Sequence, residues 1–147
     1  MLSGTTFGYI NGIITMLSLI SGMYVTHVTK IGIIGAILAM VISDPLLDAY
    51  AIYIAQKANN PDISPSVAIR AFVTQVGLQA MFLTIIIVSP TIKQGLYASY
   101  VAGFIGTCLY GYYKDLSLID TVKNLISIAA LVCLTIIIDS AVYKRFK

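Results

Sequence analysis

The sequence predicts an all-α, polytopic membrane protein in which five hydrophobic helices form a single domain over residues 1–147. Two observations lead to this prediction. Hydrophobic residues make up 59% of the chain and charged residues only 10%, whereas a soluble domain has about a quarter charged residues. Stretches of about 20 nearly uncharged residues, the length needed to cross a bilayer, also recur along the chain. A soluble fold would lack the polar residues needed to cover its core.

Turn signals separate the five expected transmembrane helices. These helices cover about residues 7–28, 31–56, 67–88, 95–113 and 118–142. The segment 57–66 is rich in Pro, Asn, Asp and Ser and predicts a short loop, with Ser64 or Ser66 as the N-cap of the third helix. The pair Ser89-Pro90 is expected to end that helix, because proline cannot continue a helical hydrogen-bond ladder.

Basic residues do not fix the orientation of the chain in the membrane. The net charge is +3, but no long basic run indicates nucleic-acid binding, so lipid headgroups are the expected partners. Five helices place the two termini on opposite sides of the membrane. Four basic residues fall on the N-terminal side and five on the other: Lys57, Arg70, Lys114 and Lys123 against Lys30, Lys93, Lys144, Arg145 and Lys147.

Two carboxylates interrupt the second hydrophobic helix. Asp44 and Asp48 are four residues apart and share one helix face, on which Met40 lies one turn earlier. Two carboxylates this close repel each other unless a cation or a proton lies between them. Oxygen donors beside a thioether suit Fe²⁺ or Mn²⁺ better than Ca²⁺ or Mg²⁺. Pro45 frees a backbone carbonyl on the preceding turn that a cation can use.

Further polar residues lie inside the hydrophobic helices and are candidates to line a pathway. Asn11 offers an amide oxygen to a cation or cross-links helices, and Thr15 follows it one turn later. Ser43 precedes the first carboxylate, while Gln75 and Gln79 form an i,i+4 pair on the third helix. Hydrogen bonding between helices is the alternative role for Asn11, Gln75 and Gln79. The acidic pair can likewise be purely structural, bonded to a Tyr, Thr or Gln of a neighbouring helix.

Two glycines on the first helix are expected to serve packing. Gly12 and Gly22 would allow close approach of another helix. Motifs for phosphate binding, zinc binding and hydrolysis are absent from the sequence. We therefore predict that the chain is not an enzyme and carries no resident cofactor.

Two segments of the chain resemble the vacuolar iron transporter family. Residues 11–15, Asn-Gly-Ile-Ile-Thr, are similar to the family's first-helix pattern Asp-Gly-Leu-x-Thr. Residues 39–44, Ala-Met-Val-Ile-Ser-Asp, look like its second-helix pattern Ser-Met-x-x-Gly-Glu, with Met and carboxylate at the same spacing of four. Weaker similarity covers most of the remaining chain.

The resemblance implies export of Fe²⁺ or Mn²⁺ from the cytosol in exchange for protons. It implies a homodimer with a cytosolic N-terminus and a pathway at the dimer interface lined by the first two helices. Asn11, Met40 and Asp44 match the family's pathway Asp, Met and second-helix carboxylate. Asn11 cannot titrate, so proton coupling would have to use Asp44 or Asp48, or be lost. The short loop 57–66 also leaves no room for the Glu-rich cytosolic metal-binding bundle found in plant and fungal members, so the chain resembles a minimal member.

Two other functions fit the same sequence. A small membrane scaffold or assembly subunit would use its polar residues only to hold helices together. A passive cation channel, or a carrier of another substrate, would have the same helices without a step that selects for Met coordination. Neither alternative is an enzyme.

Overall fold

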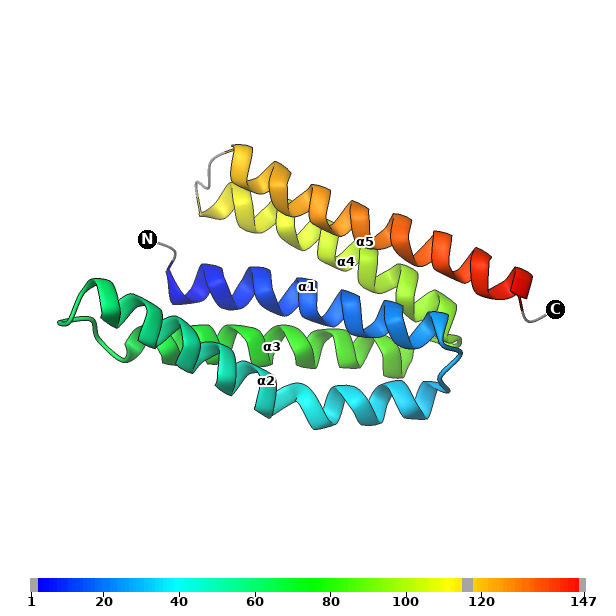
Figure 1. Cartoon of the computed structure of the whole chain (residues 1–147), viewed down its shortest axis with the longest axis horizontal. Helices are drawn as coiled ribbons and strands as arrows, with labels where there is room; N and C mark the ends of the chain where they lie inside the picture. The colour runs from blue at the N-terminus through cyan, green and yellow to red at the C-terminus, as the bar shows by residue number, and fades with distance from the viewer. Residues whose placement is uncertain (1–2, 115–117, 146–147) are drawn as a thin grey trace.

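The computed structural model describes residues 3–114 and 118–145, and all the regular structure in these residues is helical (Figure 1). The five helices are α1 (Gly4–Val25), α2 (Lys30–Asn59), α3 (Ser66–Val88), α4 (Ile92–Tyr113) and α5 (Leu118–Arg145). The prediction of five helices in an all-α chain is thus confirmed, with boundaries shifted by a few residues. α1 begins at one end of the bundle and α5 ends at the other (Figure 1). We name these ends by a lysine at each: the Lys57 end, where α1 begins, and the Lys30 end, where α5 ends.

Hydroxyl side chains cap three of the helix starts. The capping residues, each of which accepts a backbone N–H three positions later, are Ser3, Thr29 and Thr91. α3 is different, because Pro65 occupies its N-cap position and makes no side-chain cap. The prediction of Ser64 or Ser66 as the N-cap was therefore wrong. The Ser64 hydroxyl instead accepts the Ser66 N–H at 3.3 Å within the preceding turn.

Four segments of the described chain are long and apolar enough to cross a membrane. They are α1, α2, α3 and the part of α5 over Thr121–Ile138. These segments are what an integral membrane protein requires. α4 is as long as α1, but it contains four glycines and five tyrosines and is not among the four. α4 is therefore long enough to cross a membrane, but its composition is less apolar than that of the four segments.

The bundle is apolar outside and holds amides inside, which is the arrangement expected of a protein surrounded by lipid. Large aliphatic side chains are exposed along α2, including Leu38, Ile42 and Leu47. Gln75 and Gln79 have no exposed surface. Water-soluble proteins place these residue types the other way round. The exterior of the bundle is thus suited to hydrocarbon.

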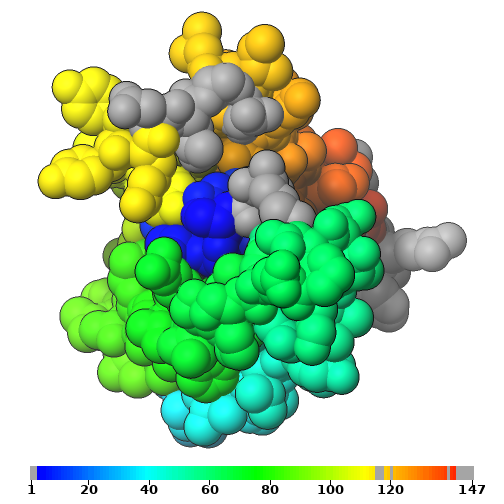
Figure 2. Space-filling view, turned by 90° about the vertical axis from the view of Figure 1, so that its left-hand side faces the viewer, coloured from blue at the N-terminus to red at the C-terminus, as the bar shows by residue number. Residues whose placement is uncertain are grey.

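α1 is the central helix, and glycines on one of its faces bring it against α3. Figure 2 shows α1 in the middle of the Lys57 end, with parts of the other four helices around it. A Cβ added to Gly4 would lie 2.0 Å from the Val67 carbonyl oxygen, and one added to Gly8 would lie 2.3 Å from the Ala71 carbonyl oxygen. Only glycine permits this approach at these two positions.

Gly12 continues this face, and an added Cβ there would lie 3.2 Å from Leu78 Cδ1. Its expected packing role is consistent with this geometry. Gly22 has nothing within 4 Å of its added Cβ, so the expected close approach at Gly22 was wrong. Gly22 instead lines a groove between α1 and α5.

α2 is bent about half-way along its length (Figure 1). Pro45 lies inside the helix and is fully buried. The proline ring removes one backbone hydrogen bond and displaces the carbonyl on the preceding turn, which is a common cause of such a bend. The sequence expectation of an interrupted ladder near the two carboxylates agrees with this shape.

Candidate functional site

Two carboxylates lie half-way along α2, on the face that meets the centre of the bundle. Asp44 and Asp48 are separated by one helical turn and are both half-buried. A charged carboxylate at the depth of the bilayer centre costs about 3 kcal/mol on insertion scales. Such groups are therefore expected to have partners or a function.

Carboxamides from the two neighbouring helices bind these carboxylates. Gln75 Nε2 donates to Asp44 Oδ2 at 3.0 Å and to Asp48 Oδ2 at 2.7 Å. Gln79 Nε2 donates to Asp44 Oδ2 at 3.0 Å. Asn11 Nδ2 donates to Asp48 Oδ2. These five side chains, which we call the carboxylate–amide cluster, join α1, α2 and α3.

The local sequence explains why these side chains meet. The buried residues of α3 form a stripe at helical spacing, Ala71, Gln75, Gln79, Phe82 and Ile86. This stripe turns both glutamines toward α1 and α2. On α1, Gly8 and Gly12 flank Asn11 and bring its backbone close to α3. The short amide side chain can then reach the acidic face of α2.

Two buried oxygens in the cluster have no partner. Gln75 Oε1 and Gln79 Oε1 accept no hydrogen bond, although both side chains are fully buried. A buried acceptor left unpaired costs about 1–3 kcal/mol. A half-turn of a carboxamide exchanges its oxygen and nitrogen, because the two atoms have nearly the same size and geometry. After that rotation the oxygens would face the carboxylates, an arrangement that a cation stabilises and that an empty site disfavours.

The cluster combines two carboxylates with neutral amide side chains. Among the described residues, amides donate hydrogen bonds to the two carboxylates and no basic side chain forms an ion pair with them. In the part of the chain that the structure describes, no group of three or more His, Cys, Asp or Glu gathers to hold a metal tightly. Carboxylate and amide oxygens are ligands for divalent cations. The donor set among the described residues is therefore too sparse for a closed structural metal site.

The other residues predicted to line a pathway lie near this cluster in sequence but are not bonded to it. Ser43 is exposed, and its hydroxyl donates to the Ala39 carbonyl oxygen of its own helix at 3.1 Å. Met40 and Thr15 are half-buried, and the hydrogen bonds of the cluster do not include them. Their roles as ligand or lining residues stay predictions. For Gln75 and Gln79, the structure shows the bonding between helices that was the alternative to a pathway role.

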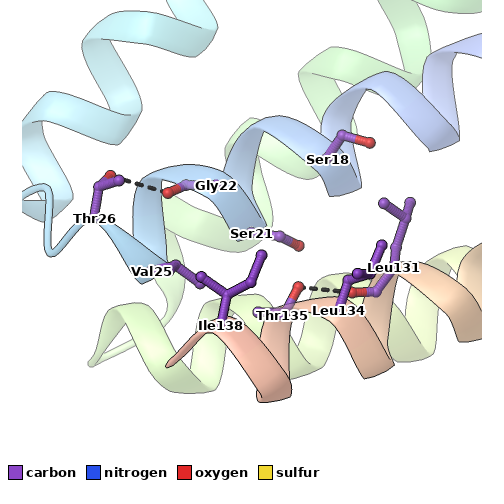
Figure 3. Close-up of a pocket in the computed structure, with 9 residues that line it drawn as sticks. All are labelled: Ser18, Ser21, Gly22, Val25, Thr26, Leu131, Leu134, Thr135 and Ile138. Atoms are coloured by element: carbon purple, nitrogen blue, oxygen red, sulfur yellow. Dashed lines mark hydrogen bonds between the residues drawn. The ribbon is translucent and has the colours of Figure 1, made fainter. Parts of the chain in front are cut away.

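A second polar feature, which the sequence did not reveal, joins α1, α4 and α5. The Tyr100 hydroxyl lies 2.5 Å from Ser21 Oγ and 2.8 Å from Thr135 Oγ1. Ser21 and Thr135 also donate to Leu17 O and Leu131 O of their own helices. Figure 3 shows Ser21 and Thr135 on facing helices beside a groove of about 320 Å³ between α1 and α5. A hydroxyl residue in each of three hydrophobic stretches was the only available signal, and it is a weak one.

No family model, curated protein or solved structure matches the chain. The resemblance to vacuolar iron transporters is therefore still a prediction. Any functional conclusion depends on the geometry of the carboxylate–amide cluster.

Proposed function

We propose that the chain transports a divalent transition-metal cation, Fe²⁺ or Mn²⁺, across a membrane through the carboxylate–amide cluster. The observation that supports this function best is a pair of carboxylates at mid-helix beside two buried amide oxygens without partners. Membrane proteins rarely keep acidic groups at this depth without a role in moving ions or protons. The cation is the substrate of this process and not a resident cofactor.

The amides give the site two alternating states. Without a cation, Gln75, Gln79 and Asn11 donate to the carboxylates and keep them apart from lipid. A cation between Asp44 and Asp48 removes the need for these donors, and rotated carboxamides can add their oxygens to its coordination. The thioether of Met40, one turn away, favours a transition metal over Ca²⁺ or Mg²⁺. Any proton coupling must use Asp44 or Asp48, because Asn11 has no titratable proton.

The sequence predicts a pathway lined by the first two helices, and this proposal adds α3 to them. Gln75 and Gln79 supply three of the four hydrogen bonds to the carboxylates. We further propose that α4 crosses the membrane together with the other four helices, because it is 22 residues long and packs against α1, α3 and α5. The homodimer and the cytosolic N-terminus follow from the family resemblance and belong to the same proposal.

Metal flux into liposomes tests the assignment of the site. A dye quenched by Fe²⁺ or Mn²⁺ inside the vesicles reports transport by the purified protein. The Asp44→Asn variant keeps an oxygen acceptor for Gln75 and Gln79 but loses the charge, so we expect at least a tenfold loss of flux, about 1.4 kcal/mol. Asp62→Asn is the matched control, because it is the same change at an exposed aspartate in the turn between α2 and α3, away from the cluster. Equal flux for wild type and Asp44→Asn would exclude the site.

A structural scaffold is the second candidate, and the hydrogen bonds that cross three helices favour it. This function predicts that Asp44→Asn changes stability in detergent without changing any response to metal. Binding to the folded state must raise the thermal unfolding temperature, so Mn²⁺ titrated against wild type separates the two functions. The third candidate, a passive channel or a carrier of another substrate, has no step that selects for coordination by Met40. If Met40→Leu leaves the order of preference among Fe²⁺, Mn²⁺, Zn²⁺ and Ca²⁺ unchanged, the channel is the better description.

A further inference from the structure

A groove follows the seam between α4 and α5, which lie side by side in Figure 1. Its larger part has a volume of about 390 Å³ and is lined by apolar side chains that include Val101, Phe104, Ile105 and Ala129. A smaller hollow of about 120 Å³ adjoins it toward the Lys30 end. Tyr100 and Val132 line both hollows, so the two lie end to end along the α4–α5 seam, which we treat as one groove.

The smaller hollow is polar and carries one positive charge. Lys93, Tyr24, Tyr97 and Ser140 line it. No acidic side chain is among the described residues around it. Lys93 also lies in the first turn of α4, where the helix dipole adds positive potential. This end of the groove therefore attracts an anion.

The ammonium group of Lys93 is available, in contrast to that of its neighbour at the same end of the bundle. Lys30 Nζ donates to Ile87 O at 2.8 Å and to Ser89 O at 2.7 Å, which occupies it with the C-terminal carbonyls of α3. For Lys93, the described part of the chain offers no hydrogen bond or ion pair, and the side chain is exposed. A lysine without a described partner, in a hollow that Tyr24, Tyr97 and Ser140 also line, is suited to a phosphate group.

The distance along α4 fits one acyl chain. Phe104 follows Lys93 by eleven residues, which at about 1.5 Å per residue is roughly 16 Å along the helix. The hydrocarbon core of one leaflet is about 15 Å thick, half of the bilayer value. A ligand with its phosphate at Lys93 would thus have its hydrocarbon tail along the apolar part of the groove.

We propose that this groove is a binding site for an anionic phospholipid, with its headgroup at Lys93 and one acyl chain along the α4–α5 seam. Charge selects the headgroup, and the continuous apolar trough selects a molecule with a tail over a free anion. The two hollows that share Tyr100 and Val132 carry this inference. It does not depend on metal transport.

Lipid retention measured by mass spectrometry tests the proposal. The purified protein is exchanged into vesicles with equal amounts of phosphatidylglycerol and phosphatidylcholine, extracted in mild detergent and analysed for bound lipid. We expect roughly fivefold more phosphatidylglycerol than phosphatidylcholine, the factor that corresponds to about 1 kcal/mol for one lysine. Lys93→Gln should reduce this ratio to about one. Lys114→Gln, the same change at the opposite end of α4, should leave it unchanged.

A second variant tests the trough independently of charge. Ala129 lines the groove and is exposed, so Ala129→Trp fills the space without entering the core. We expect it to reduce retention of both lipids at unchanged thermal unfolding temperature in phosphatidylcholine. Equal ratios for Lys93→Gln and Lys114→Gln would overturn the proposal, as would displacement of the lipid by millimolar inorganic phosphate. A loss of oligomer mass in Ala129→Trp with lipid retention unchanged would assign the groove to a second copy of the chain.

Discussion

The α1–α2–α3 side and the α4–α5 side of the bundle use different means to join hydrophobic helices. On the first side, glycines allow backbone contact and carboxylates accept hydrogen bonds from amides across three helices. On the second side, one tyrosine hydroxyl of α4 links neutral hydroxyls of α5 and α1, and an open groove of about 390 Å³ remains between α4 and α5. The charged residues thus lie beside the backbone contact between α1 and α3, and a groove of about 300 Å³ opens elsewhere on this side, between α2 and α3. Close packing fixes the acidic pair in position, while the looser side leaves space that lipid can fill.

Breaking the backbone contact on the tight side should have the largest effect. In Gly8→Ala the new methyl would lie 2.3 Å from the Ala71 carbonyl oxygen, so α1 and α3 must separate. We expect a loss of about 3 kcal/mol in the free energy of unfolding in detergent. Gly22→Ala is the control, because nothing lies within 4 Å of its Cβ position. That variant should be unchanged or up to about 1 kcal/mol more stable, and equal effects of the two would contradict the described helix contact.

Adding a third carboxylate to the cluster should lower the free energy of unfolding by a smaller amount, and bound metal should reverse this loss. Gln75→Glu replaces the donor that serves both Asp44 and Asp48 with another acid. We expect about 2 kcal/mol lower stability without metal, because like charges in a poorly solvated site repel. Mn²⁺ should raise the thermal unfolding temperature of this variant more than that of wild type. Gln94→Glu, an exposed change at the start of α4, should show neither effect.

Removing the hydroxyl at the centre of the looser side should cost less. Tyr100→Phe deletes the contacts with Ser21 and Thr135, but both of these residues keep a bond to a carbonyl of their own helix. We expect a loss of about 1 kcal/mol, the typical net value of one hydrogen bond. The response to Mn²⁺ should equal that of wild type, measured in the same thermal unfolding assay. A changed metal response would mean that the two sides of the bundle are coupled.

The smallest expected change in stability comes from substituting the two lysines at the Lys30 end, Lys30 and Lys93. Lys30→Met removes two bonds to the C-terminal carbonyls of α3, and about 0.5 kcal/mol should be lost. Lys93→Met should change nothing in detergent without anionic lipid, because no described partner is lost. Thermal unfolding at low and high salt distinguishes them, since only the Lys30 contribution should decline as salt rises.

The sequence was sufficient to predict the helices because length and apolar composition decide them. The segment 57–66 and the Ser89-Pro90 pair correctly separated the second, third and fourth helices. The N-cap of α3 was missed, because any of three adjacent small or cyclic residues can begin that helix and only the chain path selects among them. α4 was expected as a long, nearly uncharged stretch, although its glycines and tyrosines leave it outside the four segments that are apolar enough to cross a membrane.

The sequence was sufficient to predict the part of the candidate site that lies on α2, but it gave the contacts of that part with the other helices only incompletely. Asp44 and Asp48 were evident because charge is rare in these stretches, and their i,i+4 spacing gave their shared face. The sequence contained Asn11, Gln75 and Gln79 as polar residues on two other helices, but periodicity does not give the rotation of one helix against another. The glycines that set the approach of α1 to α3 decide that rotation. Tyr100 was missed for the same reason, since a tyrosine in a hydrophobic helix is ordinary until its neighbours are known.

The central position of α1 also has a consequence for the timing of synthesis. A chain is made from its N-terminus, so α1 leaves the ribosome before any helix that surrounds it. α3, which covers its glycine face, is complete about 60 residues later, which takes several seconds at roughly 5–20 residues per second. Asn11 gains its carboxylate partner earlier in that interval, when Asp48 of α2 is inserted. The helix that becomes the most enclosed is therefore the one that waits longest for its neighbours.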